Sequence, residues 1–175
     1  METTQSLSAA SSPSAVLSPE KTILAWYDAW ADDMLRFCFL CLGSQQEAEK
    51  ALQDAFVRLL NDQSASLECP APRAVCLRSA CRKRFRRSGG AHPADDAALA
   101  AQLTAFGCTH PDDLKLLTGI MHLPFTERCI LLMTGWLGLA EEETAFAMQL
   151  RRAAVRKHRK SVEELIAQIL PEMEE

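Results

Sequence analysis

The sequence predicts an all-α protein made of two small helical domains joined by a linker. At 175 residues, the chain has the length of one domain or two small ones. Its 7 Gly and 1 Tyr, set against abundant Ala, Leu, Arg, Glu and Gln, favour helices over strands. Apolar residues also recur at helical spacing in most segments. A composition of 48% hydrophobic and 24% charged residues excludes a wholly disordered chain, a collagen-like fibre and a disulfide scaffold.

The expected first domain covers residues 18–88. It follows a tail, residues 1–17, which is rich in Ser, Ala and Thr and is expected to be disordered. The segment Ser18-Pro-Glu20 starts a helix with a capping side chain, a proline in the first turn and an acid near the positive end of the helix dipole. This helix is expected to end at Gly43. Its apolar face consists of Ile23, Trp26, Trp30, Met34, Phe37 and Cys41.

Two more helices are predicted in this domain. Ser44 and Glu47 form a capping box for the second helix, which makes a helical hairpin with the first. The apolar face of the second helix consists of Ala48, Leu52, Ala55, Phe56 and Leu59. The third helix is predicted from about Arg73, after a proline-rich stop, to the Ser-Gly-Gly sequence at 88–90.

Residues 89–111 are the expected linker, because they mix Gly, Pro, Ala and Asp with a weak helical stretch near 97–106. The expected second domain covers residues 112–170. Its apolar spacing predicts two short helices on either side of Pro124, a third helix that begins at Glu141, and a last helix that is rich in Arg. A short helix, a tight turn and a basic helix form the helix-turn-helix pattern.

The net charge of −4 hides two basic segments in an otherwise acidic chain. Seven basic residues and no acidic residue lie between Arg73 and Arg87, and six more lie between Arg151 and Lys160. Such segments suit a polyanionic partner, because binding to phosphates releases condensed counterions. A single basic run is more often a solvated helix face. Two acid-free runs in one acidic chain favour the polyanion.

The 7 cysteines are expected to be buried free thiols, because their number is odd and most lie within apolar helical patterns. Cys38 and Cys41 form a Cys-x-x-Cys pair without a second pair at zinc-site spacing, so neither a metal nor a cofactor is expected. No catalytic motif stands at interpretable spacing, which argues against an enzyme. The chain has no long apolar run and no signal-peptide pattern, so a cytoplasmic location without membrane insertion is expected.

Two parts of the chain resemble bacterial sigma factors of the extracytoplasmic-function type, which belong to the sigma-70 family. The sequence AEKALQDAF at 48–56 is similar to the family segment Ala-Glu-Asp-Leu-Val-Gln-Glu-Thr-Phe. The sequence LPFTER at 123–128, followed by GLAEEETA at 138–145 and the basic helix from Arg151, is similar to the family's second conserved domain without an internal gap. The resemblance covers roughly residues 20–170, and the order and spacing of its motifs make it specific.

The resemblance implies a two-domain subunit for transcription initiation. Residues 18–88 would correspond to sigma region 2, which binds the polymerase core and the −10 promoter element, and residues 112–170 to region 4, which reads the −35 element. The expected partners are therefore promoter DNA and RNA polymerase core, and an anti-sigma factor is a further candidate.

The resemblance also assigns site residues by position. The residues expected to read the −35 element are Arg151, Arg152, Ala154, Arg156, Lys157 and Lys160. Those expected near the −10 element are Arg78, Arg82, Lys83 and Arg86. Polymerase-core contacts are assigned to Leu52, Gln53 and Asp54, although Leu52 fits a core position equally well. The residues of the last helix that are expected to face its own core are Val155, Val162 and Leu165.

Alternatives stay open where the residues differ from the family. Lys50 reverses a charge on the expected polymerase-facing helix, and Arg82 and Arg86 stand where the family has polar, uncharged or acidic side chains. These differences suit a stand-alone DNA-binding regulator that has lost polymerase binding, and a module that binds only another protein is a third possibility. Gln149 also occupies the position of the usual turn glycine. Pairing of the basic residues with the protein's own carboxylates would argue against DNA contact.

Overall fold

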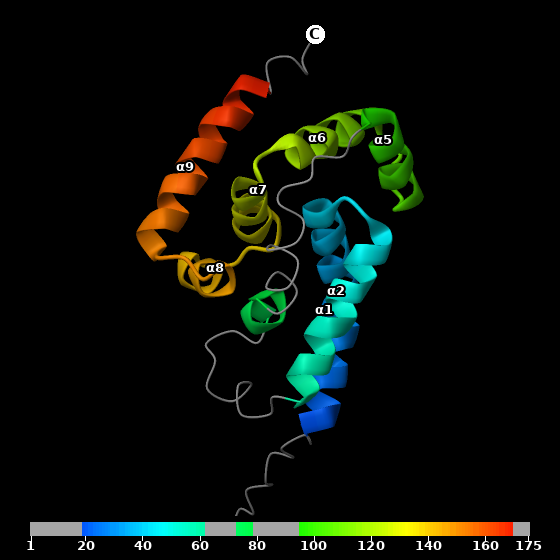
Figure 1. The fold of residues 1–175 in the computed structure, drawn as a ribbon, viewed down its shortest axis with the longest axis vertical. Coiled ribbons are helices and arrows are strands. Elements are labelled where there is room, and N and C mark those ends of the chain that lie inside the picture. Colours follow the sequence, from blue (N-terminus) through cyan, green and yellow to red (C-terminus); the bar gives the residue numbers. More distant parts are fainter. Residues whose placement is uncertain (1–18, 62–72, 79–94, 170–175) are drawn as a thin grey trace, which may run out of the picture.

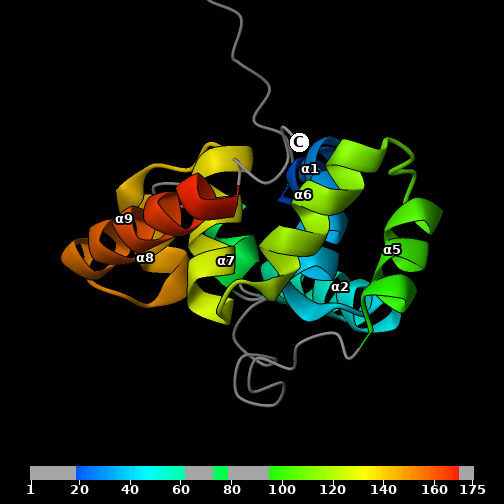
Figure 2. The same cartoon turned by 90° about the horizontal axis from the view of Figure 1, so that it is seen from above.

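The computed structural model describes residues 19–61, 73–78 and 95–169, and all secondary structure in these ranges is helical. The all-α prediction is therefore confirmed. Figure 1 shows a hairpin of α1 and α2 on one side of the molecule and α7, α8 and α9 on the other, with α5 and α6 packed at one end of the hairpin. The view from above in Figure 2 shows the same separation of α2 from α9. The expected tail, residues 1–17, lies outside the described residues.

The hairpin consists of α1 (Pro19–Leu42) and α2 (Gln45–Asn61), close to the predicted bounds. Gly43 joins them in the left-handed conformation, with φ of 69°, which glycine adopts without a steric cost. The predicted apolar faces meet between the two helices. Their fully buried members include Met34, Phe37 and Ala55. This packing forms the centre of the core.

Residues 73–78 form a short helix at the start of the predicted third helix, and the rest of that prediction lies outside the described residues. Arg73 attaches this helix to two other parts of the chain. Its guanidinium lies 3.3 Å from the carboxylate of Asp33 in α1 and donates to the carbonyl oxygen of Leu137 at 3.2 Å. The buried residues of this short helix are Ala74, Cys76 and Leu77.

The second half of the expected linker is helical and packed. Helix α5 (Asp96–Ala105) begins with a cap, because Asp95 accepts a hydrogen bond from the Ala97 N–H at 2.9 Å. Leu99 and Leu103 of α5 are each 1% exposed. The ring of Phe106 then stacks on Phe39 of α1 with a centroid distance of 4.3 Å. These contacts attach the segment to the hairpin, which the Gly and Pro content of the region did not indicate.

The remaining helices are α6 (Pro111–His122), α7 (Phe125–Leu131), the π-helical turn η1 (Leu132–Trp136), α8 (Glu141–Met148) and α9 (Arg152–Ile169). Pro124 separates α6 from α7, as predicted. Gly138 ends the turn after η1 with φ of 65°. A small second cluster consists of Ile130, Ala145 and Val155, with Met148 and Leu150 packed against it. It holds α7, α8 and α9 together.

The largest hydrophobic cluster includes residues from both expected domains, for example Phe37 of α1 and Met133 of η1. Arg128 of α7 reinforces this contact. Its guanidinium is buried and donates to the carbonyl oxygens of Leu40 and Cys41, in the last turn of α1. The α1–α2 hairpin and the α7–α9 segment are therefore packed against each other through a shared core.

Candidate nucleic-acid interface

The N-terminal half of α9 presents most of its cations to solvent. Arg151, which directly precedes α9, and Arg152, Arg156, Lys157 and Lys160 within it are all exposed, and Ala154 is half-buried. On the opposite side of the helix, Val155 and Val162 are fully buried, as predicted, and Leu165 is half-buried. The sequence therefore identified correctly which face of this helix packs inward and which faces solvent.

The turn before α9 is tight and left-handed. Gln149 has φ of 56° and ψ of 38°, and the Leu150 N–H donates to the carbonyl oxygen of Ala145 at 2.9 Å. This hydrogen bond closes the end of α8, so that α9 begins at Arg152, three residues after Gln149. A left-handed residue with a Cβ is sterically strained. Gln149 thus adopts the left-handed conformation at the position where the family resemblance expects glycine.

Replacing Gln149 by glycine is expected to raise the free energy of unfolding by roughly 0.5–1 kcal/mol, because glycine adopts this conformation without strain. Urea unfolding followed by circular dichroism measures the change. Gln149→Ala is the matched control, since it removes the side chain but keeps the Cβ, and it should show no gain. Equal stabilities of the glycine and alanine variants would contradict the prediction.

Two glutamates at the start of α8 pair with cations of α9. Glu142 lies 2.6 Å from the guanidinium of Arg152, and Glu141 accepts a hydrogen bond from Arg156 at 2.7 Å. Glu141 also lies 3.6 Å from Arg159. The hydrogen bond from Arg156 lowers the pKa of Glu141, and the same bond raises the pKa of Arg156.

These pairs are the arrangement that argues against DNA contact, but their exposure limits their strength. The side chain of Arg156 is 63% exposed and that of Arg152 is 54% exposed. Exposed ion pairs contribute little net free energy and are screened by salt, so phosphates can compete with the glutamates. Arg151 and Lys157 have no carboxylate within ion-pair distance among the described residues. Lys160 has only a contact of 4.0 Å with Glu164.

The other residues assigned from the resemblance do not gather at this face where the structure describes them. Arg78 is half-buried, with its guanidinium 4.7 Å from the ring centroid of Phe146 in α8, and Arg82, Lys83 and Arg86 lie outside the described residues. Of the residues assigned to polymerase binding, Leu52 is 7% exposed and belongs to the core, Asp54 is half-buried and Gln53 is exposed. Figures 1 and 2 both place α2 on the side of the molecule opposite α9.

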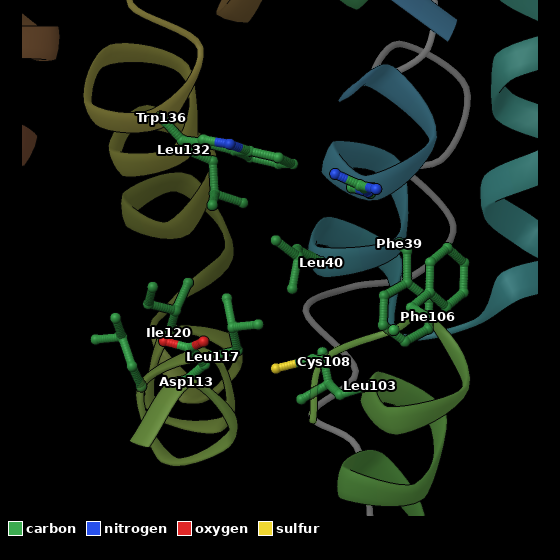
Figure 3. A pocket seen from close by; sticks show the side chains of 13 residues that line it. Phe39, Leu40, Leu103, Phe106, Cys108, Asp113, Leu117, Ile120, Leu132 and Trp136 are labelled. Atoms are coloured by element: carbon green, nitrogen blue, oxygen red, sulfur yellow. The ribbon is translucent and has the colours of Figure 1, made fainter. Parts of the chain in front are cut away.

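A groove of about 490 Å³ lies between α1, the segment joining α5 to α6, α6 itself and η1. Figure 3 shows Leu40 of α1 facing Leu132 and Trp136 of η1 across it, with Phe39 beside Phe106. Burial raises the pKa of Cys108 at its edge, and the negative charge of Asp113 raises it further. The groove is therefore lined mainly by apolar side chains, together with the Cys108 thiol and the charged side chains of Arg36 and Asp113. The sequence did not indicate it, because its lining residues are far apart along the chain.

Comparison with models of protein families and with curated proteins finds no match to this chain. The described part of the chain contains no group of three or more His, Cys, Asp or Glu side chains that could hold a metal ion. None of the described helices combines the length and the apolar character needed to cross a bilayer.

Proposed function

We propose that this chain is a sigma factor of the extracytoplasmic-function type, which directs RNA polymerase core to promoter DNA. The single observation that carries the proposal is the exposed, cationic N-terminal half of α9, which follows α8 across a left-handed turn. This geometry supports a helix-turn-helix formed by residues 141–169. In such motifs, the N-terminal part of the second helix enters the major groove and contacts base edges and phosphates.

The core behind α9 supports this role for the helix. Val155 and Val162 pack inward, and α7 lies behind α9, so the outward face of the helix keeps a fixed orientation. Arg151 and Lys157 are available to phosphates or guanine edges without breaking an ion pair with a described residue. Arg152 and Arg156 become available once the glutamates are displaced. We infer that binding to DNA exchanges these intramolecular ion pairs for phosphate contacts.

Replacing Arg156 and Lys157 together by alanine is expected to weaken binding to duplex DNA about tenfold at low salt. Each lost phosphate contact should also reduce the slope of log affinity against log salt by about one. Fluorescence anisotropy with a random-sequence duplex, repeated over a range of salt concentrations, measures both quantities. Lys21→Ala combined with Lys115→Ala is the matched control, since it removes the same charge from exposed positions on α1 and α6. A slope unchanged by the α9 substitutions would rule out this helix as the DNA-contacting element.

The second candidate is a stand-alone DNA-binding regulator that does not engage polymerase. It is favoured by the burial of Leu52, which leaves Gln53 as the exposed member of the three residues assigned to polymerase contact, and by the exposed Lys50 nearby. Co-elution of the purified chain with RNA polymerase core, and run-off transcription from the region upstream of its gene, distinguish the two. A sigma factor gives both results, whereas the regulator binds the duplex and gives neither.

A further inference from the structure

Two buried thiols touch at the contact between the hairpin and the α7–α9 segment. The Sγ atoms of Cys41, in the last turn of α1, and Cys129, in α7, lie 3.3 Å apart. The side chains are separated by 88 positions along the chain and are almost fully buried, with residue exposures of 5% and 0%.

A buried cation lies beside this pair. Arg128 precedes Cys129 directly, and its guanidinium donates to the carbonyl oxygen of Cys41 at 3.4 Å. No carboxylate of the described residues pairs with it. Burial lowers the pKa of Arg128, while the interaction with Cys41 and with Cys129 raises it. The guanidinium places a positive charge next to this pair of cysteines, and the thiolate is the form of cysteine that reacts with oxidants.

Two other described thiols have a raised pKa. Burial raises the pKa of Cys76 to about 12, so its thiol stays protonated near neutral pH. Burial raises the pKa of Cys108 as well, and the negative charge of Asp113 raises it further. Cys38 is buried one turn before Cys41 in α1. Cys41 and Cys129 have both a second sulfur in contact and a neighbouring cation.

We propose that Cys41 and Cys129 form a reversible disulfide under oxidation by a hydroperoxide, which links α1 covalently to α7. In the first step, the thiolate of one cysteine attacks an oxygen of the peroxide, the O–O bond breaks, and a sulfenic acid and water form for hydrogen peroxide. In the second step, the sulfur of the other cysteine attacks the sulfenic sulfur, the S–O bond breaks, and a second water leaves. Two thiols are oxidised and one peroxide is reduced to two waters.

The position of the bond determines its effect. It would join two segments that are otherwise held together by packing and by the hydrogen bonds of Arg128. Because the sulfurs are covered, the oxidant reaches them only when the contact between α1 and α7 opens locally. Once formed, the disulfide prevents any later separation of the hairpin from the α7–α9 segment. This inference does not depend on the proposed function.

Peptide mapping of the full chain tests the link. After treatment with hydrogen peroxide, the remaining thiols are alkylated and the protein is digested with trypsin without reduction. Trypsin cleaves after Arg36 and Lys50, and after Arg128 and Arg151, so Cys129 is the only cysteine in its peptide, whereas Cys38 and Cys41 share one. The expected product is the peptide 37–50 joined to the peptide 129–151, with a loss of two hydrogen atoms that dithiothreitol reverses.

Serine variants show whether Cys38 or Cys41 forms the link to Cys129. The link should persist in Cys38→Ser and disappear in Cys41→Ser and in Cys129→Ser. Fragmentation of the wild-type linked peptide gives the same assignment if a serine variant fails to fold. A link through Cys38, or oxidation of Cys129 to sulfinic acid without any link, would overturn the proposal.

Thermal unfolding provides a second readout. A crosslink that closes a loop of this length restricts the unfolded chain, so the oxidised wild type should melt several degrees above its reduced form. The Cys38→Ser variant should show the same shift, and Cys41→Ser should show none. An oxidised form that melts at or below the temperature of the reduced form would contradict a native-state disulfide.

Discussion

Replacing Arg128 by alanine is expected to lower the free energy of unfolding by about 3 kcal/mol or more. The side chain is 1% exposed, and its guanidinium donates to the carbonyl oxygens of Leu40, Cys41 and Leu123 at 3.2, 3.4 and 3.1 Å. Two of these carbonyls belong to the last turn of α1, where a helix leaves its carbonyls without intrahelical partners. Alanine leaves all three carbonyls without this donor and opens a cavity between α1 and α7.

Urea unfolding followed by circular dichroism measures this loss. Arg128→Lys should recover only part of it, because one ammonium on a flexible stem cannot reproduce the planar fork that spans three carbonyls. Arg36→Ala removes an exposed cation from α1, the helix whose carbonyls Arg128 contacts, and should change the free energy of unfolding by less than about 0.5 kcal/mol. A loss below about 1 kcal/mol in Arg128→Ala would mean that the carbonyls do not depend on the guanidinium.

Arg128 also illustrates why part of the fold was not predictable. The helices themselves followed from local signals, such as the glycine at 43 and the proline at 124, and from apolar spacing within one segment. The role of Arg128 depends on carbonyl oxygens that lie 88 and 87 positions away. An arginine in an amphipathic helix is expected at the surface, and only the packing of α7 against α1 reveals its burial.

The linker and the candidate DNA-contacting face also depend on contacts between segments that local sequence patterns do not reveal. Gly and Pro near residues 88–93 predicted a linker at positions that lie outside the described residues, and they gave no sign that Leu99 and Leu103 enter the core. On α9, apolar spacing predicted that Val155 and Val162 face inward. The pairing of Arg156 with Glu141 depends on how α8 and α9 cross, and charge counting along the chain cannot provide that angle.

Replacing Glu141 and Glu142 together by glutamine is expected to strengthen binding to duplex DNA several-fold at low salt, because two negative charges beside the cations of α9 are removed. Both carboxylates lie in the first turn of α8 and pair with cations of α9. They compete with phosphates for Arg152 and Arg156, and they place negative charge at a helix N-terminus that would otherwise favour a phosphate. Fluorescence anisotropy with the same random-sequence duplex measures the gain.

Glu143→Gln is the matched control for this prediction, because Glu143 lies in the same turn of α8 and carries the same charge. Its carboxylate accepts a hydrogen bond from the Ala140 N–H at 2.9 Å instead of pairing with α9. If the glutamates act by occupying the arginines, Glu143→Gln should change DNA affinity much less than the double substitution does. An equal gain per charge in both variants would show that only net charge matters. No gain in either variant would show that α9 does not bind phosphates, and the cations would then serve mainly to hold α8 against α9.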